Sequence, residues 1–204
     1  MDMVMSGLIF ETCLVYLDDI VIFSRTWEEH LPRLEAVLKR ILDTGLKLKP
    51  SKCKLLQRKV IFLGHVITGD GVATDPSKTE EINRWPVPRS TKDVRSFLGL
   101  CGYYRRFINQ YAEIAFPMTS LLKKGAKFRW SETCQEAFEK LKAALTSPPI
   151  LAMPRDEGTF FLDTDASDHS VGAVLSQMQD GQERVIAYAA KVLQPAQVKY
   201  CAYR

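Results

Sequence analysis

With 204 residues, of which 46% are hydrophobic, the chain can bury a real core and form one or two domains. It has no apolar stretch long enough to cross a bilayer, and its first residues lack the cationic region of a signal peptide. The net charge of +4 is modest. The cysteines form no CxxC pair and no zinc-ligand spacing with the histidines. Such scattered thiols favour a reducing compartment, so we expect an intracellular protein without membrane contact.

The stretch from Cys13 to Ser24, CLVYLDDIVIFS, predicts a β-hairpin. Two short runs rich in β-branched and aromatic residues, Cys13 to Tyr16 and Ile20 to Phe23, flank the acidic pair Asp18 and Asp19. The pair is expected to form the turn, and the second run a strand covered on both faces. Adjacent carboxylates repel each other and lose hydration when buried. Two interpretations follow: a solvated turn, the common case for Asp-Asp, or a pair neutralised by a divalent cation.

A helix is predicted directly after the hairpin. Thr26 and Glu29 form a capping box, and Gly45 is a natural stop. Apolar residues at three- and four-residue spacing predict a buried stripe, namely Leu31, Leu34, Val37, Leu38, Ile41 and Leu42. The segment Lys39 to Lys59 is rich in lysine and arginine and has a single acid. It favours either a phosphate-backbone ligand or a solvated lysine-rich surface.

Short strands are predicted next, at Leu46 to Lys49 and at Lys59 to Thr68. Gly64 inside the second strand indicates a bulge or the close approach of another backbone. A Gly-Asp-Gly turn signal follows at residues 69–71. Asp75, followed by a proline, is expected to cap a short helix that ends before the rigid Trp-Pro-Val-Pro segment.

Helices are predicted over most of residues 90–146, with Ser90 and Ser131 as N-caps of the first and last. Between them, Tyr103 to Ile108 mixes aromatic residues with arginines. This mixture favours contacts with phosphates and sugars, or else rings packed in a core with solvent-facing arginines. Both interpretations stay open on the sequence.

The last part of the chain predicts three antiparallel strands. They are expected at Phe160 to Asp165, Val171 to Met178 and Val185 to Ala190, with Asp180-Gly181 as the turn between the second and third. Asp165 ends the first strand, where an aspartate by default caps the next turn.

Several of these stretches resemble the motifs of one family, in its order. Tyr16-Leu17-Asp18-Asp19 resembles the YxDD motif of reverse transcriptases, within a run similar to the gypsy-type LTR retrotransposon Pol polyprotein. The other matching blocks are Phe62-Leu63-Gly64-His65, Phe97-Leu98-Gly99-Leu100, Tyr103-Tyr104-Arg105-Arg106-Phe107 and Thr164-Asp165-Ala166-Ser167. These blocks together, in the family's order, are stronger support than any one of them.

The resemblance implies an α+β fold in three parts. Residues 1–84 would be the end of a reverse transcriptase palm with its β-hairpin, residues 85–148 a helical thumb and connection, and residues 149–204 the first strands of a ribonuclease H-like fold. The implied function is RNA-directed DNA polymerisation with linked ribonuclease H, by two-metal phosphoryl transfer on an RNA/DNA template-primer. Alternatives are a non-catalytic nucleic-acid-binding remnant, and a fragment that folds poorly because its terminal sheet leaves an exposed edge.

The resemblance also implies roles for particular residues. Asp18, Asp19 and Asp165 would be catalytic and would bind Mg²⁺ or Mn²⁺. Contacts with the template-primer would come from Tyr16, Leu17, Phe62, Leu63, Gly64, His65, Tyr104, Arg105 and Arg106. The family's upstream aspartate, its later ribonuclease H carboxylates and its dNTP-holding fingers are not in this sequence. We therefore expect both sites to need the rest of the Pol polyprotein, in the cytoplasm or the nucleus.

Overall fold

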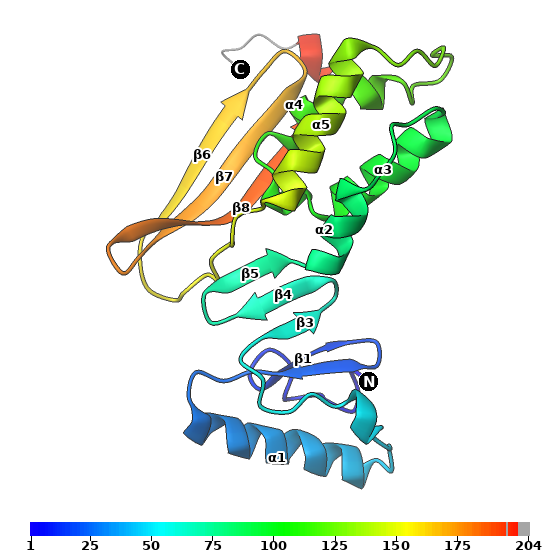
Figure 1. The fold of residues 1–204 in the computed structure, drawn as a ribbon. Helices are drawn as coiled ribbons and strands as arrows, with labels where there is room; N and C mark the ends of the chain where they lie inside the picture. The colour runs from blue at the N-terminus through cyan, green and yellow to red at the C-terminus, as the bar shows by residue number, and fades with distance from the viewer. Residues whose placement is uncertain (195, 200–204) are drawn as a thin grey trace. The chain divides into compact units, whose positions relative to one another are not determined.

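The computed structural model describes residues 1–194 and 196–199. The chain divides into two compact units, Met1–Gln57 and Arg58–Arg204. Within the described residues the sheets are small and antiparallel, and each is built from strands that are consecutive in the chain (Figure 1). This mixture of helices with separate small sheets confirms the predicted α+β class.

The first unit contains the predicted hairpin, formed by β1 (Cys13–Tyr16) and β2 (Asp19–Ile22). Tyr16 pairs with Asp19, so the two-residue turn consists of Leu17 and Asp18. The prediction that Asp18 and Asp19 together make the turn was wrong by one residue, because Asp19 already belongs to the ladder. Leu17 has a φ of +53°, a left-handed conformation that a β-carbon disfavours.

Helix α1 (Trp27–Asp43) begins as predicted. The Thr26 hydroxyl accepts a hydrogen bond from Glu29 N at 3.3 Å, and Glu29 Oε2 accepts one from Arg25 N at 3.2 Å. The chain leaves the helix through Gly45, at a φ of +72°.

The core of the first unit is smaller than predicted. Its fully buried residues are Met5, Cys13, Val37 and Ile41. The other stripe leucines of α1 are partly or largely exposed, Leu42 at 76%, and β2 is at most half-buried. A two-stranded hairpin offers too little surface to cover the whole stripe. Residues 46–49 form no strand either, because their Leu-Lys alternation meets no partner strand among the described residues; the short turn η1 (Pro50–Lys52) follows.

The second unit begins with the sheet of β3 (Val60–Phe62), β4 (His65–Thr68) and β5 (Gly71–Thr74). The single strand predicted for residues 59–68 is therefore a hairpin. Leu63 and Gly64 form its two-residue turn, both with positive φ, at +49° and +67°. Such a conformation is typical of a type I′ turn, whose twist matches the flanking strands. Neither a bulge nor another backbone lies at Gly64: the glycine occupies the turn, and the side chains of Tyr103 and Tyr104 approach it.

Four helices of this unit pack on a common core. They are α2 (Pro76–Asn83), α3 (Thr91–Tyr103), α4 (Tyr111–Ser120) and α5 (Glu132–Thr146), with the short turn η2 (Arg105–Phe107) between α3 and α4. The predicted caps Asp75, Ser90 and Ser131 each accept a hydrogen bond from a backbone N–H in the first turn. The core contains Val94, Phe97, Leu98, Cys101, Phe138 and Leu141.

The terminal sheet consists of β6 (Phe160–Ala166), β7 (Ser170–Gln179) and β8 (Gln182–Val192). All three strands were predicted, as was the turn at Asp180 and Gly181, which both have positive φ. Helix α4 packs against β7 and β8, while the edge strand β6 is exposed along its whole length. A short turn, η3 (Gln197–Lys199), lies near the end of the described chain.

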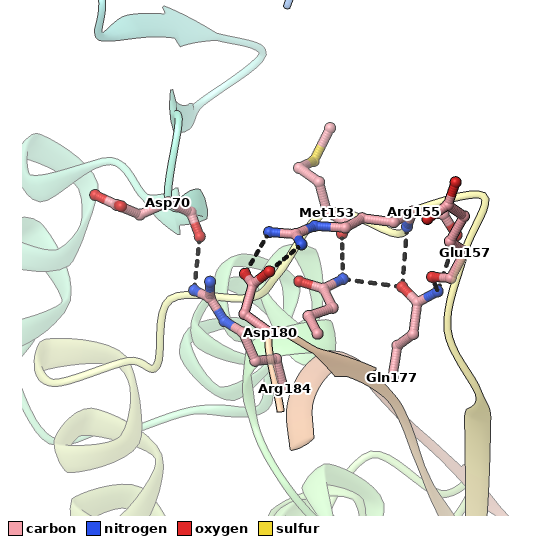
Figure 2. A network of polar contacts seen from close by, with 8 residues as sticks. Asp70, Met153, Arg155, Glu157, Gln177, Asp180 and Arg184 are labelled. Carbon is pink, nitrogen blue, oxygen red and sulfur yellow. Dashed lines mark hydrogen bonds and ion pairs between the residues drawn. The ribbon is translucent and has the colours of Figure 1, made fainter. Parts of the chain in front are cut away.

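A polar network fixes the segment before the terminal sheet (Figure 2). Gln177 and Gln179 are buried, and their amides donate hydrogen bonds of 2.8 Å to the backbone carbonyls of Arg155, Glu157 and Met153. At the exposed end of the network, Arg155 forms a two-pronged ion pair with Asp180 at 2.9 Å. No helix in the described part of the chain has the length and apolar character needed to cross a membrane.

Candidate catalytic and nucleic-acid-binding site

The predicted catalytic pair lies at the tip of the β1–β2 hairpin. Asp18 occupies the turn, Asp19 starts β2, and both are exposed. Neither carboxylate has a hydrogen-bond or ion-pair partner among the described residues. Their neighbours Tyr16 and Leu17 are exposed at 52% and 74%. The hairpin therefore presents this acidic tip to solvent, where a ligand can reach it.

The residues of this tip fit a metal that is shared with a substrate. No cluster of three or more histidine, cysteine, aspartate or glutamate side chains in the described chain could enclose a metal ion. Asp18 and Asp19 offer only hard oxygen donors, and Mg²⁺ is usually bound by one or two carboxylates together with substrate phosphates and water. The donor chemistry thus suits Mg²⁺ or Mn²⁺, with the remaining ligands supplied from outside.

The second predicted site, the turn between β3 and β4, is held by two tyrosines at the end of α3. The Tyr103 hydroxyl donates a short hydrogen bond to the Leu63 carbonyl, and the Tyr104 hydroxyl donates to the Gly64 carbonyl at 2.8 Å. The Gly64 carbonyl also accepts a hydrogen bond from Asp75 N at 3.2 Å. Burial, together with the neighbouring Tyr103, raises the pKa of Tyr104 to about 12, so its hydroxyl remains a donor at neutral pH.

His65 fills the space beneath this turn. Its ring stacks on Tyr103 and Phe107, with centroids 5.4 Å and 5.6 Å away, and meets the edge of Tyr104 at 5.5 Å. Its Nδ1 is buried without a hydrogen-bond partner. Burial and, to a lesser degree, the charge of Arg106 lower the pKa of His65. The histidine is therefore a neutral ring that packs the turn.

Residues 103–107 combine aromatic and basic side chains that differ in burial. Tyr104 and Phe107 are buried at 1% and 2% exposure, whereas Arg105 and Arg106 face solvent. Phe62 is half-buried and Leu63 is partly exposed. Tyr104 and Phe107 thus belong to the core, while Tyr103 is 51% exposed. Contacts of the solvent-facing arginines with phosphates stay a prediction.

Asp165 lies at the end of β6, opposite Gly172. Both of its oxygens accept hydrogen bonds: Oδ1 from Ala166 N at 2.9 Å, and Oδ2 from Gln110 Nε2 at 3.4 Å. An open hollow of about 490 Å³ lies beside it on the sheet. Small side chains line most of the hollow, namely Thr164, Ala166, Val171, Gly172, Ala173, Ala189 and Ala190.

The loop after Asp165 is held by α4. Glu113 accepts hydrogen bonds of 2.7 Å from the hydroxyls of both Ser167 and Ser170. The His169 ring stacks on Phe116, with centroids 4.5 Å apart. The two serine hydroxyls lower the pKa of Glu113. Glu113 was not predicted from the sequence, because more than 50 residues separate it from the loop and nothing local marks the pairing.

Comparisons with known proteins match both ends of the chain. Residues 1–67 match the family model described as reverse transcriptase (RNA-dependent DNA polymerase). Residues 130–204 match the model described as an RNase H-like domain found in reverse transcriptase. Segments similar to a reverse transcriptase and to an RNase H-like domain thus follow each other in this chain.

Full-length relatives are similar along nearly the whole chain. The retrovirus-related Pol polyprotein from transposon 297 of Drosophila melanogaster is 44% identical over 203 residues, covering 99% of this chain and 19% of the polyprotein. The transposon Tf2-3 polyprotein of Schizosaccharomyces pombe is 34% identical over 186 residues, covering 91% of this chain and 14% of that one. The chain therefore spans less than a fifth of the length of these curated relatives.

Solved structures agree with the fold. The foamy viral protease-reverse transcriptase dRH in complex with ds DNA matches 99% of this chain and 35% of its own, with a TM-score of 0.84 and 27% identity. The foamy viral protease-reverse transcriptase in complex with an RNA/DNA hybrid matches 99% of this chain and 27% of its own, with a TM-score of 0.81 and 27% identity. The fold is that of the end of a reverse transcriptase joined to an RNase H-like start.

Proposed function

We infer that the chain is a segment of a retrotransposon Pol polyprotein, which acts as an RNA-directed DNA polymerase with a linked ribonuclease H. Similarity to Pol polyproteins along 99% of the chain supports this. The order of the motif blocks supports the gypsy-type subclass. We propose the family's divisions at residues 84/85 and 148/149, for palm, thumb with connection, and ribonuclease H.

The observation that carries the polymerase assignment is the exposed acidic tip of the β1–β2 hairpin. Asp18 and Asp19 stand free of partners within the described residues, on a segment that matches the reverse transcriptase family. In this proposal their carboxylates hold Mg²⁺ or Mn²⁺ together with the phosphates of an incoming dNTP. When bound, the metal supplies activation of the primer 3′-hydroxyl and charge stabilisation of the leaving pyrophosphate. Tyr16 and Leu17 border the template-primer end.

The remaining site residues bind and orient the template-primer. The Phe62 to His65 hairpin offers a rigid turn for the primer's 3′ end, and the solvent-facing Arg105 and Arg106 suit phosphate contacts. Asp165 contributes one carboxylate to the ribonuclease H site, next to the open hollow on its sheet. Its other carboxylates come from the rest of the Pol polyprotein.

We place this activity inside the cell, in the cytoplasm and the nucleus. Cys13, Cys53, Cys101 and Cys134 are free thiols, which suits a reducing compartment.

The test is primer extension by a Pol polypeptide that includes this chain, on an RNA template with a DNA primer. We expect Mg²⁺-dependent extension that Asp18→Asn with Asp19→Asn removes, while the affinity of the polypeptide for the template-primer persists. Binding without extension in the wild-type polypeptide would instead identify a binding remnant. Absence of both binding and extension would refute the assignment.

A further inference from the structure

We propose that Tyr103 and Tyr104 are positioning residues that fix the Leu63–Gly64 turn, and through it the seat of the primer's 3′ end. The effect on the primer rests on the proposed function. The fixing of the turn rests on the contacts alone, all of which lie within the second unit.

The first observation is that both carbonyls of one two-residue turn receive a tyrosine hydroxyl. Leu63 O accepts from Tyr103, and Gly64 O accepts from Tyr104. The ladder of this hairpin closes at the Phe62–His65 pair, so it leaves these turn carbonyls free for other donors. Here adjacent residues at the end of α3 supply the donors, 40 positions along the chain. Together with Asp75 N, which also donates to the Gly64 carbonyl, the two hydroxyls fix both carbonyls and so define the orientation of the turn.

The second observation is the tight packing at Gly64. A β-carbon at this position would lie 3.3 Å from the Tyr104 hydroxyl oxygen and 3.5 Å from two atoms of Tyr103. The φ of +67° also favours glycine. Gly64 thus packs closely against the two tyrosines, and the turn has little room to move without breaking their hydrogen bonds.

The third observation concerns which residues can touch a ligand. Tyr104 is 1% exposed, so it acts on a primer through the turn and not by direct contact. Tyr103 is 51% exposed, and its hydrogen bond to the Leu63 carbonyl is what assigns it to the turn. Arg105 and Arg106 follow directly in the chain and face solvent. The tyrosines therefore hold the turn in a fixed relation to two cations that suit phosphates. A primer that contacts both the turn and the two arginines would therefore be positioned by a single rigid part of the chain.

The test compares Tyr103→Phe, Tyr104→Phe and the double variant with a matched control, Tyr111→Phe. The Tyr111 hydroxyl also donates to a backbone carbonyl of the same unit, that of Leu98 at 3.2 Å, but away from the turn. Each variant keeps its ring and loses one hydroxyl, so the loss of stability is similar for all single variants.

Hydrogen exchange of the full chain tests the fixing of the turn. We expect exchange of residues 62–66 and of the Asp75 amide to rise about fivefold in each of the two tyrosine variants, as loss of one hydrogen bond implies. Tyr111→Phe leaves these amides unchanged. Unchanged exchange in the double variant would overturn the proposal without bearing on the family assignment.

Steady-state extension by the Pol polypeptide tests the effect on the primer. We expect the double variant to lower kcat by about tenfold with little change in KM for the template-primer, since a misplaced primer end slows the chemical step. Tyr111→Phe keeps the wild-type kcat. A faster-exchanging turn with wild-type kcat would reduce the tyrosines to structural residues and overturn the proposal. A wild-type polypeptide that neither binds nor extends a primer would refute the proposed function itself, and the primer role with it.

Discussion

The two predicted carboxylate sites differ in what the chain itself provides around them. Asp18 and Asp19 project from an exposed turn without a partner among the described residues. Asp165 accepts hydrogen bonds at both oxygens, and α4 holds the loop behind it through Glu113 and Phe116. The first site leaves the orientation of its carboxylates to the ligand, whereas the second orients its carboxylate beforehand.

This contrast predicts that the two sites respond differently to substitution. A free carboxylate contributes to function and almost nothing to stability. An oriented carboxylate contributes to both function and stability. Substitution of an ionisable residue that helps to orient it should change how the free energy of unfolding depends on pH.

The largest expected effect is that of Asp18→Asn with Asp19→Asn. In the Pol polypeptide, primer extension should fall on the order of 10² to 10³, because the neutral amides are poor ligands for a divalent cation. The free energy of unfolding of the chain should change by less than about 0.5 kcal/mol, as for other exposed sites. Asp2→Asn, at another exposed aspartate of the same unit, is the control and should affect neither. A loss of stability above that value would show that the acidic tip is not free.

Next in size is Asp165→Asn. Cleavage of the RNA strand of a hybrid by the Pol polypeptide should fall on the order of 10². The chain should also lose up to about 1 kcal/mol of stability, because the asparagine NH₂ group replaces one of the two oxygens that accept hydrogen bonds. Asp163→Asn, on the same strand, is the matched control for both measurements. Full cleavage by Asp165→Asn would remove this residue from the catalytic set.

A smaller effect is expected for Glu113→Gln. Since the serine hydroxyls lower the pKa of Glu113 in the folded chain, its stabilising effect is present above the ordinary carboxyl pKa of 4.5 and is lost as the pH falls below it. Wild-type stability should therefore decline more steeply than that of the variant between about pH 5 and pH 3. The control is Glu136→Gln, at an exposed residue of α5. Parallel pH profiles for wild type and Glu113→Gln would mean that α4 does not hold the loop through this charge.

The smallest effect is expected for Gly172→Ala, opposite Asp165. A β-carbon there would meet no atom closer than 4.0 Å, and the backbone is not left-handed, so the alanine should stabilise the chain by about 0.5 kcal/mol. Gly158→Ala is the opposite case, because its β-carbon would lie 2.4 Å from the Met178 carbonyl oxygen at a φ of +102°. Thermal unfolding of the two variants separates them. Destabilisation by Gly172→Ala would contradict the open hollow beside Asp165.

Local chemistry made part of this fold predictable. The caps at Thr26, Asp75, Ser90 and Ser131 and the Asp180–Gly181 turn depend on neighbouring residues, and all were found where expected. The turn at Leu63 could not be read in the same way. A leucine with positive φ has no favourable local signal, and hydrogen bonds from 40 residues away stabilise the turn.

The candidate sites follow the same division. The exposed acidic tip was evident from a contiguous motif. The support of Asp165 by Gln110 and Glu113 was not, because it joins side chains that only the packing of α4 brings to the loop. The prediction that the apolar stripe of α1 is buried was wrong for a related reason. Periodicity marks an apolar face of a helix, but it does not show whether the rest of the unit offers enough surface to cover that face.

The glutamine network of Figure 2 bears on how the polypeptide can be cut. By composition, residues 147–158 look like a linker that a protease would open first. Yet their backbone is bonded to the buried Gln177 and Gln179, and Leu151 exchanges hydrogen bonds of 2.8 and 2.9 Å with Val72 of β5. Cleavage here would leave the buried side-chain amides of Gln177 and Gln179 without their hydrogen-bond acceptors. Residues 147–158 should therefore resist limited proteolysis. A C-terminal piece excised at this point would lose the backbone carbonyls that Gln177 and Gln179 of its own sheet bind.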